Sequence, residues 1–299
     1  MTSHRVPTVC ALAVAALLPL SADAQSYRFS VVASGLTRPV GIAVEGSEEL
    51  YFTEVPNPGV PGAGNGVSHL DLETRVITRI SNGEPEPTNL AISREGDVYW
   101  TCKSAGVILR HLETSGMTEL VVGGLQEPSG ISVGRSGAVY FTEIPTPGLP
   151  GPAGGLNTVS VLRGNNKMVI SMGEPEPTDV VVARNGDLYW TCKTAGVILR
   201  RSQGVTSVFK AGLESPSGIA IDHRDEVLYF SEVPTPGVAG RDGGRNAVRA
   251  IHIASGEMGT IHLGDPEPTD VAVARNGNVY WTCTSAGVIV EAKRTGRGR

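Results

Sequence analysis

The sequence repeats itself three times, and this repetition constrains the fold more than any other feature of the chain. Segments of the form G-L-x-x-P-x-G-I begin at Gly35, Gly124 and Gly212, so that 89 and then 88 residues separate neighbouring copies. Each copy continues with a Y-F-(T/S)-E segment, a G-(E/D)-P-E-P-T segment and a closing Y-W-T-C segment. A chain of this kind stacks copies of one supersecondary unit.

Each copy contains one pattern twice: a proline, an apolar strand, a turn, and a second strand ending in Y-(F/W)-(T/S). The chain is therefore built from six related units of roughly 45 residues, the length of a four-stranded propeller blade. The predicted strands are short, β-branched and aromatic, and Asn185-Gly186 and Asn276-Gly277 are strong hairpin signals. No 3.6-residue apolar period supports helical repeats. The sequence predicts an all-β, six-bladed β-propeller made of three two-blade repeats.

The two ends of the chain supply an independent check on this prediction. The last unit ends near Lys293 without a fourth strand, whereas the segment from Tyr27 to Leu36 resembles the fourth strands that end at Leu125 and Leu213. We therefore expect Tyr27–Ala33 to pair with the final blade. This pairing would close the ring and leave no raw sheet edge between its ends.

The N-terminal segment has the features of an export signal. His4 and Arg5 precede an apolar run from Val9 to Leu20, and small residues then lead to a cleavage site before Gln25. We predict a signal peptide over 1–24, a propeller over 25–294 and a basic tail over 295–299, and hence a secreted or periplasmic protein. No later run approaches the ~20 apolar residues that cross a membrane. We expect a monomer.

The formal net charge is -5, and no run of Lys and Arg lies inside the body of the chain. The electrostatic attraction to phosphate that nucleic-acid binding requires is therefore missing, and we expect no nucleic-acid partner. A small-molecule substrate or ligand is the expected partner.

Several polar residues are predicted to gather at one mouth of the central channel, because the start of the first strand and the end of the second lie on the same face of a meander. Glu54, Glu143 and Glu232 end second strands in alternate blades, and cysteines occupy the same place in the other blades. Asn89, Asp179 and Asp270 begin inner strands where the neighbouring blades carry glycine. Oxygen ligands of this kind suit Ca²⁺ or another divalent cation.

The segments Pro39–Val44 and Leu50–Glu54, with their copies, resemble the NHL-repeat propellers and a wider superfamily. That superfamily includes the regucalcin (SMP-30)/gluconolactonase proteins, virginiamycin B lyase, strictosidine synthase and paraoxonase. The resemblance covers the mature chain and implies the six-bladed fold, but a fold shared by many activities says little about function.

In gluconolactonase-like proteins a catalytic divalent metal is held by Glu, Asn and Asp at the channel mouth. The resemblance implies Asn89, Asp179 and Asp270 as metal ligands, assisted by one or more of the three glutamates, Glu54, Glu143 and Glu232. These glutamates and the two aspartates are also the candidate catalytic acids and bases. An alternative is that each carboxylate only caps a turn by accepting local backbone N–H groups, since recent duplication repeats structural residues too.

The cysteines that remain after removal of Cys10 are Cys102, Cys192 and Cys283. Threefold-equivalent positions should hold their Cα atoms on the order of 10 Å apart, beyond the ~7 Å limit for a disulfide, so none is expected. Buried thiols packed beside tryptophan are one interpretation. A nucleophile or a soft-metal trio is the other, and it requires lowered thiol pKa values.

No histidine falls in the mouth-forming segments, so the channel-mouth histidine chemistry of virginiamycin B lyase and paraoxonase transfers poorly. Two functions remain open. One is a lactonase-, esterase-, lyase- or cyclase-like enzyme, with or without a divalent cation. The other is a non-catalytic module that binds a glycan, peptide or protein at three equivalent sites.

Overall fold

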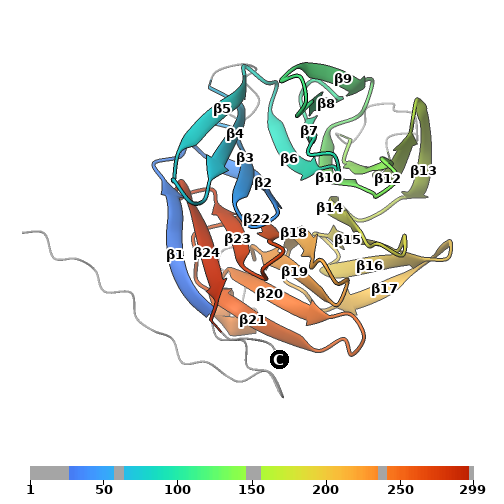
Figure 1. The fold of residues 1–299 in the computed structure, drawn as a ribbon. Coiled ribbons are helices and arrows are strands. Elements are labelled where there is room, and N and C mark those ends of the chain that lie inside the picture. The colour runs from blue at the N-terminus through green and yellow to red at the C-terminus, as the bar shows by residue number, and fades with distance from the viewer. Residues whose placement is uncertain (1–26, 57–63, 146–155, 235–240, 296–299) are drawn as a thin grey trace, which may run out of the picture.

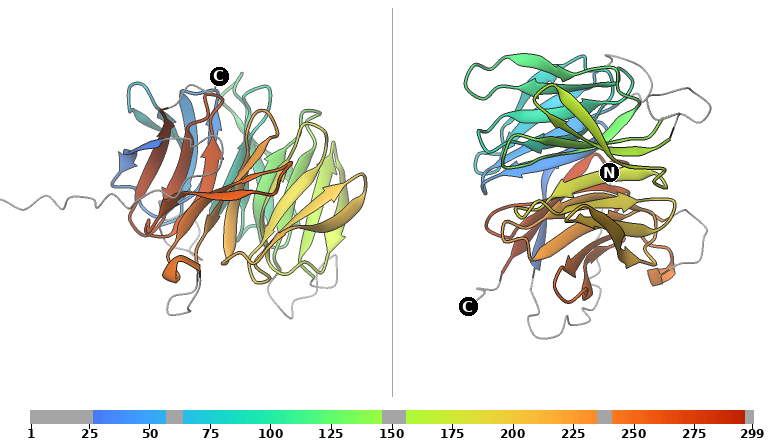
Figure 2. Two further views of the ribbon diagram at one scale, coloured as in Figure 1. Left: turned by 90° about the horizontal axis from the view of Figure 1, so that it is seen from below. Right: turned by 90° about the vertical axis from the view of Figure 1, so that its right-hand side faces the viewer.

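The computed structural model describes residues 27–56, 64–145, 156–234 and 241–295. Within them the chain forms six four-stranded antiparallel sheets arranged around a central axis (Figure 1). Figure 2 shows the blades from the side, with strands running between the two faces of the disk. The predicted signal peptide and residues 296–299 of the predicted tail lie outside the described residues. No described helix is long and apolar enough to cross a membrane.

Each blade is a simple meander from the axis to the perimeter. Blade 1 contains β2 (Pro39–Glu45), β3 (Glu49–Glu54), β4 (Gly66–Asp71) and β5 (Ile77–Asn82). Blade 2 contains β6 (Pro87–Ile92), β7 (Val98–Cys102), β8 (Val107–His111) and β9 (Thr118–Val122). Blade 3 contains β10 (Pro128–Val133), β11 (Val139–Glu143), β12 (Thr158–Arg163) and β13 (Asn166–Met172). Blades 4 and 5 contain β14 (Pro177–Val182), β15 (Leu188–Cys192), β16 (Val197–Ser202), β17 (Val205–Ala211); and β18 (Pro216–Ile221), β19 (Val227–Glu232), β20 (Ala247–His252), β21 (Met258–Leu263).

Blade 6 confirms the predicted closure of the ring. It consists of β22 (Pro268–Val273), β23 (Val279–Cys283) and β24 (Val288–Arg294), and its fourth strand is the N-terminal β1 (Tyr27–Ser34). β1 pairs antiparallel with β24 from Tyr27 opposite Arg294 to Ser34 opposite Val288. The only described helical segment is the short 3₁₀ turn η1 (Arg241–Gly243) in blade 5.

The core lies between neighbouring blades, where the faces of the sheets meet. Phe52, Phe141 and Phe230 occupy the middle of the second strand in the odd blades, and Trp100, Trp190 and Trp281 do so in the even blades. All six rings are fully buried. Burial of such side chains stabilises each seam by roughly 1.5–3 kcal/mol per residue, so each blade depends on the next for its stability.

A ring of buried hydroxyl groups joins the blades near the axis. Every inner strand has a bulge just after its first proline, which leaves one backbone N–H outside the normal ladder. A hydroxyl of the second strand accepts that N–H at 2.8–3.2 Å in all six blades. The acceptors are Thr53, Thr101, Thr142, Thr191, Ser231 and Thr282.

The same hydroxyls also reach the neighbouring blade. Among the described residues, five of the six donate to a carbonyl oxygen of the next inner strand at 2.6–3.0 Å. The bond from Thr282 to the carbonyl of Val40 joins blade 6 to blade 1. The repeated sequence pattern thus places a structural hydroxyl in all six second strands, and in five of them it also bonds the next blade.

Candidate functional site

The two sets of polar residues lie on one face of the propeller, as the strand parity predicted. The proline that begins each inner strand pairs with the last residue of the second strand. That last residue is Glu54, Glu143 or Glu232 in the odd blades and Cys102, Cys192 or Cys283 in the even blades. Glutamates and cysteines therefore alternate around this face.

Asn89, Asp179 and Asp270 occupy the bulges in the inner strands of blades 2, 4 and 6. They are therefore one strand closer to the axis than the glutamates and cysteines. Glycine fills the corresponding bulge of the preceding blade, and there is no room for a side chain there. A Cβ on Gly130 would lie 2.4 Å from the Cα of Asp179, and one on Gly218 would lie 2.3 Å from Oδ1 of Asp270. The alternation of Gly with Asn or Asp is therefore a steric requirement.

Each aspartate links its own blade to the next one. Asp179 accepts the N–H of Val180 at 2.8 Å and, through its other oxygen, the N–H of Ile219 in blade 5 at 2.8 Å. Asp270 accepts the N–H of Val271 at 2.8 Å and that of Ile42 in blade 1 at 2.9 Å. The second of these pairs crosses the seam between the last and first blades. Both carboxylates thus have a structural role.

The two aspartates also affect one another. Both side chains are buried, with exposed fractions of 4%. Burial, reinforced by the neighbouring carboxyl of Asp270, raises the pKa of Asp179 well above its usual value. Burial likewise raises the pKa of Asp270 to about 7, against the lowering effect of its backbone hydrogen bonds. A hydrogen bond from the amide of Asn89 lowers the pKa of Asp179 in part.

Asn89 breaks the threefold symmetry of this group. Its Oδ1 accepts the N–H of Leu90 at 2.6 Å, as the aspartates do with their own next residues. Its contact with Asp179 spans from blade 2 to blade 4 across Gly130. The three residues therefore form one asymmetric polar group at the axis, and we call this group the axial centre.

The three glutamates are engaged elsewhere. One oxygen of each accepts a backbone N–H from the segment before its inner strand, at 2.8 Å from Thr37, 3.0 Å from Gln126 and 2.8 Å from Glu214. The other oxygen of each pairs with a cation: Glu54 with Arg79 at 2.5 Å, Glu143 with Lys167 at 2.6 Å, and Glu232 with Arg249. These contacts match the turn-capping alternative raised by the sequence.

These observations narrow the donor set for a divalent cation. The described residues contain no group of three or more His, Cys, Asp or Glu side chains that could hold a metal ion. The axial centre offers two carboxylates and one amide, because the third equivalent position is Asn89. Hard oxygen atoms of this kind are the ligands that Ca²⁺ takes, and each of the four carboxylate oxygens already accepts one backbone N–H.

The three cysteines are free and buried, and no disulfide joins them. Burial raises the pKa of the Cys192 and Cys283 thiols to about 12, and neighbouring Glu174 and Asp265 add to the effect. Burial and Glu84, whose carboxylate lies 3.7 Å from the sulfur, raise the pKa of Cys102 as well. The thiols therefore favour the core interpretation over a nucleophile or a soft-metal trio.

One feature of this face gave no clear sequence signal. The residue before each inner-strand proline has a left-handed backbone, with φ between 45° and 58°. These residues are Arg38, Glu86, Glu127, Glu176, Ser215 and Glu267. The carbonyl of each accepts the N–H that follows the second strand, at 2.9–3.3 Å. None is glycine, so sequence patterns for positive φ do not find them.

Comparisons with known proteins agree with this architecture. No protein-family model matches the sequence, and a search of the curated proteins gives no match. A solved structure of a candidate gluconolactonase is 12% identical, with a TM-score of 0.69 and coverage of 94% of this chain and 95% of that chain.

Two other solved structures share this fold. A catalytically inactive virginiamycin B lyase from Staphylococcus aureus with quinupristin is 20% identical, with a TM-score of 0.59 and coverage of 90% and 89%. A nidogen/laminin complex is 15% identical, with a TM-score of 0.60 and coverage of 77% and 80%. At these identities the likeness establishes the fold alone.

The protein is a six-bladed β-propeller built from three two-blade repeats and closed by its N-terminal strand. Its fold is the one seen in virginiamycin B lyase and in the candidate gluconolactonase.

Proposed function

We propose that the protein is a small-molecule-processing propeller, of lactonase, esterase, lyase or cyclase type, that acts at the axial centre. The observation that carries the proposal is the convergence of Asn89, Asp179 and Asp270, from three repeats, on one asymmetric group. Catalysis needs a single group of this kind. Three equivalent binding sites would instead be built separately, one in each repeat.

Asp179 and Asp270 are the residues proposed to carry the chemistry. A carboxyl group with a pKa near 7 exchanges a proton readily at neutral pH, which suits general acid or base catalysis. Asn89 would orient Asp179 through its amide. Glu54, Glu143 and Glu232 would support the rim of the channel mouth, because each is already neutralised by an ion pair with Arg79, Lys167 or Arg249.

We further propose that the axial centre can take a divalent cation such as Ca²⁺, held by Asn89, Asp179 and Asp270. A bound cation would polarise a substrate carbonyl. The test is calorimetric titration of the chelator-treated protein with Ca²⁺, Mg²⁺ and Zn²⁺. One site per chain, lost in Asp270→Asn and kept in Glu45→Gln, supports the proposal. If none of the three ions binds, the proposed cation site is contradicted.

The catalytic proposal has its own test. Wild type, Asp179→Asn and Asp270→Asn would be assayed against lactones, aryl esters and cyclic depsipeptides. We expect activity on one of these classes, with a loss of about 10²–10⁴-fold in both variants. Glu45→Gln is the control, because Glu45 is a half-buried carboxyl of raised pKa at the opposite end of β2. Equal activity in all four proteins would contradict a catalytic axial centre.

A non-catalytic binding module is the second candidate. This candidate is supported by the similarity to a chain in a nidogen/laminin complex, and by an ion pair of Glu54, Glu143 or Glu232 that recurs in each repeat. Stoichiometry separates the candidates, because three equivalent ligands per chain would favour this module and one would favour the axial centre. Export is also a proposal, and a secreted product beginning at Gln25 would support it.

A further inference from the structure

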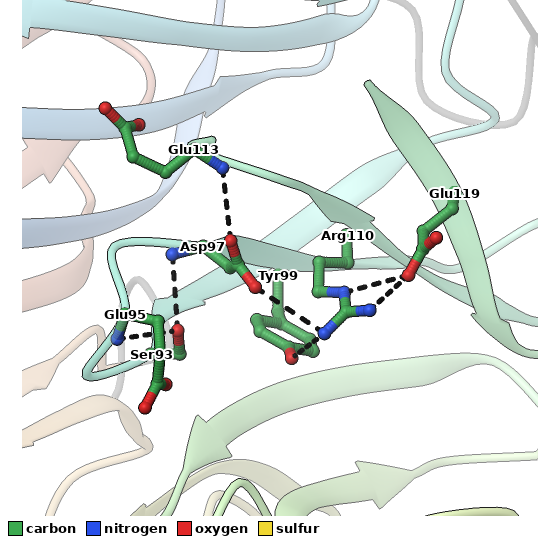
Figure 3. A network of polar contacts seen from close by, with 7 residues as sticks. All are labelled: Ser93, Glu95, Asp97, Tyr99, Arg110, Glu113 and Glu119. Atoms are coloured by element: carbon green, nitrogen blue, oxygen red, sulfur yellow. Dashed lines mark hydrogen bonds and ion pairs between the residues drawn. The ribbon is translucent and has the colours of Figure 1, made fainter. Parts of the chain in front are cut away.

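Blades 2, 4 and 6 each carry a charged residue at the same position of the third strand. The residue is an arginine in blades 2 and 4 and a glutamate in blade 6. In blade 2, Arg110 of the third strand contacts Asp97 at 3.5 Å and the hydroxyl of Tyr99 at 3.0 Å (Figure 3). It also pairs with Glu119, which lies directly opposite on the fourth strand β9. In blade 4, Arg200 pairs with Asp187 at 2.6 Å, and Ser207 lies opposite it on β17.

Blade 6 reverses the charge at this position. Glu291 replaces the arginine, and Asn278 replaces the aspartate that would repel it. Glu291 accepts Asn278 Nδ2 at 3.0 Å and the Tyr280 hydroxyl at 2.9 Å. Its second oxygen accepts the hydroxyl of Ser30, directly opposite on β1, at 3.2 Å. Glu291 is buried, with an exposed fraction of 8%, so a carboxylate opposite it would be strongly disfavoured.

The other face of β1 makes a second contact, with aromatic rings of blades 5 and 6. The ring of Phe29 packs edge-on to His262 of blade 5, at 4.7 Å between centroids, and lies 6.3 Å from Trp281. The first two repeats carry Ser81 and Ser171 where the third carries His262. His262 lies 2.9 Å from Asp265, which also accepts the N–H of Trp281 at 2.7 Å.

We propose that the edge of blade 6 is a side-chain recognition site for the closing strand, in which Glu291 selects Ser30 and the His262–Trp281 pair selects Phe29. Backbone pairing alone cannot make this choice, because every blade offers the same ladder to its fourth strand. A strand like β9 carries Glu119 at the position that corresponds to Ser30. Glu291 repels such a strand, whereas a third strand with an arginine at the position of Glu291 attracts it. Selection therefore combines attraction and repulsion, as specific recognition requires.

The test uses four single substitutions in the full chain at two exposed serines with the same register position. Ser30 faces Glu291, whereas Ser207 faces Arg200. We expect S30E to speed amide hydrogen exchange across β1 by up to about fivefold and S30K to slow it. The matched variants S207E and S207K should act on β17 with the opposite signs. Charge effects of the same sign at both serines, or none at Ser30, would overturn the proposal.

The aromatic half of the site has a separate measurement. F29A should speed exchange across β1 and leave β17 unchanged, because the rings that Phe29 packs against belong to blades 5 and 6. Unchanged exchange in β1 would overturn the role of Phe29. None of these variants touches the axial centre, so the outcome is independent of the proposed activity.

Discussion

Gly218 and Asp270 share one space at the axis: a Cβ on Gly218 would lie 2.3 Å from Oδ1 of Asp270. The glycine of blade 5 makes room for the carboxylate of blade 6, which then holds the N–H of Ile42 in blade 1. A single side chain therefore contacts three consecutive blades, and its removal or displacement should affect two seams.

This relationship predicts that Gly218→Ala and Gly130→Ala destabilise the protein by about 1–3 kcal/mol, as overpacking of a dense core does. Gly123→Ala is the control, because a Cβ there meets only a Val107 methyl at 3.6 Å and the backbone is unstrained. Urea unfolding measures the difference. Equal free energies of unfolding for all three variants would show that the space at the axis is not limiting.

The ring of hydroxyls predicts a second effect on stability. Thr282→Val keeps the shape of the side chain but removes the acceptor of the Asp270 N–H and the donor to the Val40 carbonyl. Leaving two buried groups unpaired costs about 1–3 kcal/mol each. The exposed Thr118→Val on β9 is the control and should change the free energy of unfolding little. A Thr282→Val protein as stable as wild type would argue against the ring.

The raised pKa values of the axial centre predict a pH dependence with a definite sign. The folded chain holds protons on Asp179 and Asp270 that the unfolded chain releases near pH 4. Their contribution is fully present below that pH and is lost toward higher pH, for Asp270 as the pH rises through about 7. With chelator present, the free energy of unfolding should fall between pH 5 and 8, and less so in Asp270→Asn.

Asp187 supplies the opposite control. Hydrogen bonds from Ser202 and Arg200 outweigh burial and lower its pKa, so its contribution is lost as the pH falls. Asp187→Asn should therefore leave the slope between pH 5 and 8 unchanged. An Asp270→Asn protein with the wild-type slope would contradict the assignment of the titration to the axial centre.

The ion pairs of the three glutamates predict that each glutamate needs a positively charged side chain beside it, and that this side chain can come from either of two neighbouring strands. Arg79 of β5 reaches Glu54 beside Ser68, whereas Arg249 of β20 reaches Glu232 beside Thr260. Ser68 and Arg79 are directly opposite, as are Arg249 and Thr260. Arg79→Thr should therefore cost about 1–3 kcal/mol by leaving a half-desolvated carboxylate unpaired. The double variant Ser68→Arg/Arg79→Thr should recover most of that loss in thermal unfolding.

The thiols predict a chemical property. Cys102, Cys192 and Cys283 have raised pKa values and fully buried side chains, so none should react with a thiol reagent in the folded protein at pH 7.5. All three should react once the chain is unfolded in denaturant. Rapid labelling of any of them in the native state would revive the nucleophile interpretation.

Much of the fold could be predicted from the sequence. The spacing of the glycine, proline and aromatic segments determined six short-stranded units, because each unit repeats its own local turn and strand signals. The unpaired end of the last unit and the extra strand at Tyr27 determined the closure. Strand parity placed Glu54 and Asp270 on one face, since alternation along a meander is a local property.

The tertiary structure decided what those residues do. Whether Asp270 binds a ligand or the N–H of Ile42 depends on residues 228 positions apart, and no local pattern encodes that contact. Arg79 and Arg249 neutralise equivalent glutamates from different strands, so even the repeat does not reveal the pairing. The burial of Glu291 and its proposed selection of β1 arise only when the two ends of the chain meet. Both depend on residues that are far apart in the sequence and that folding brings together.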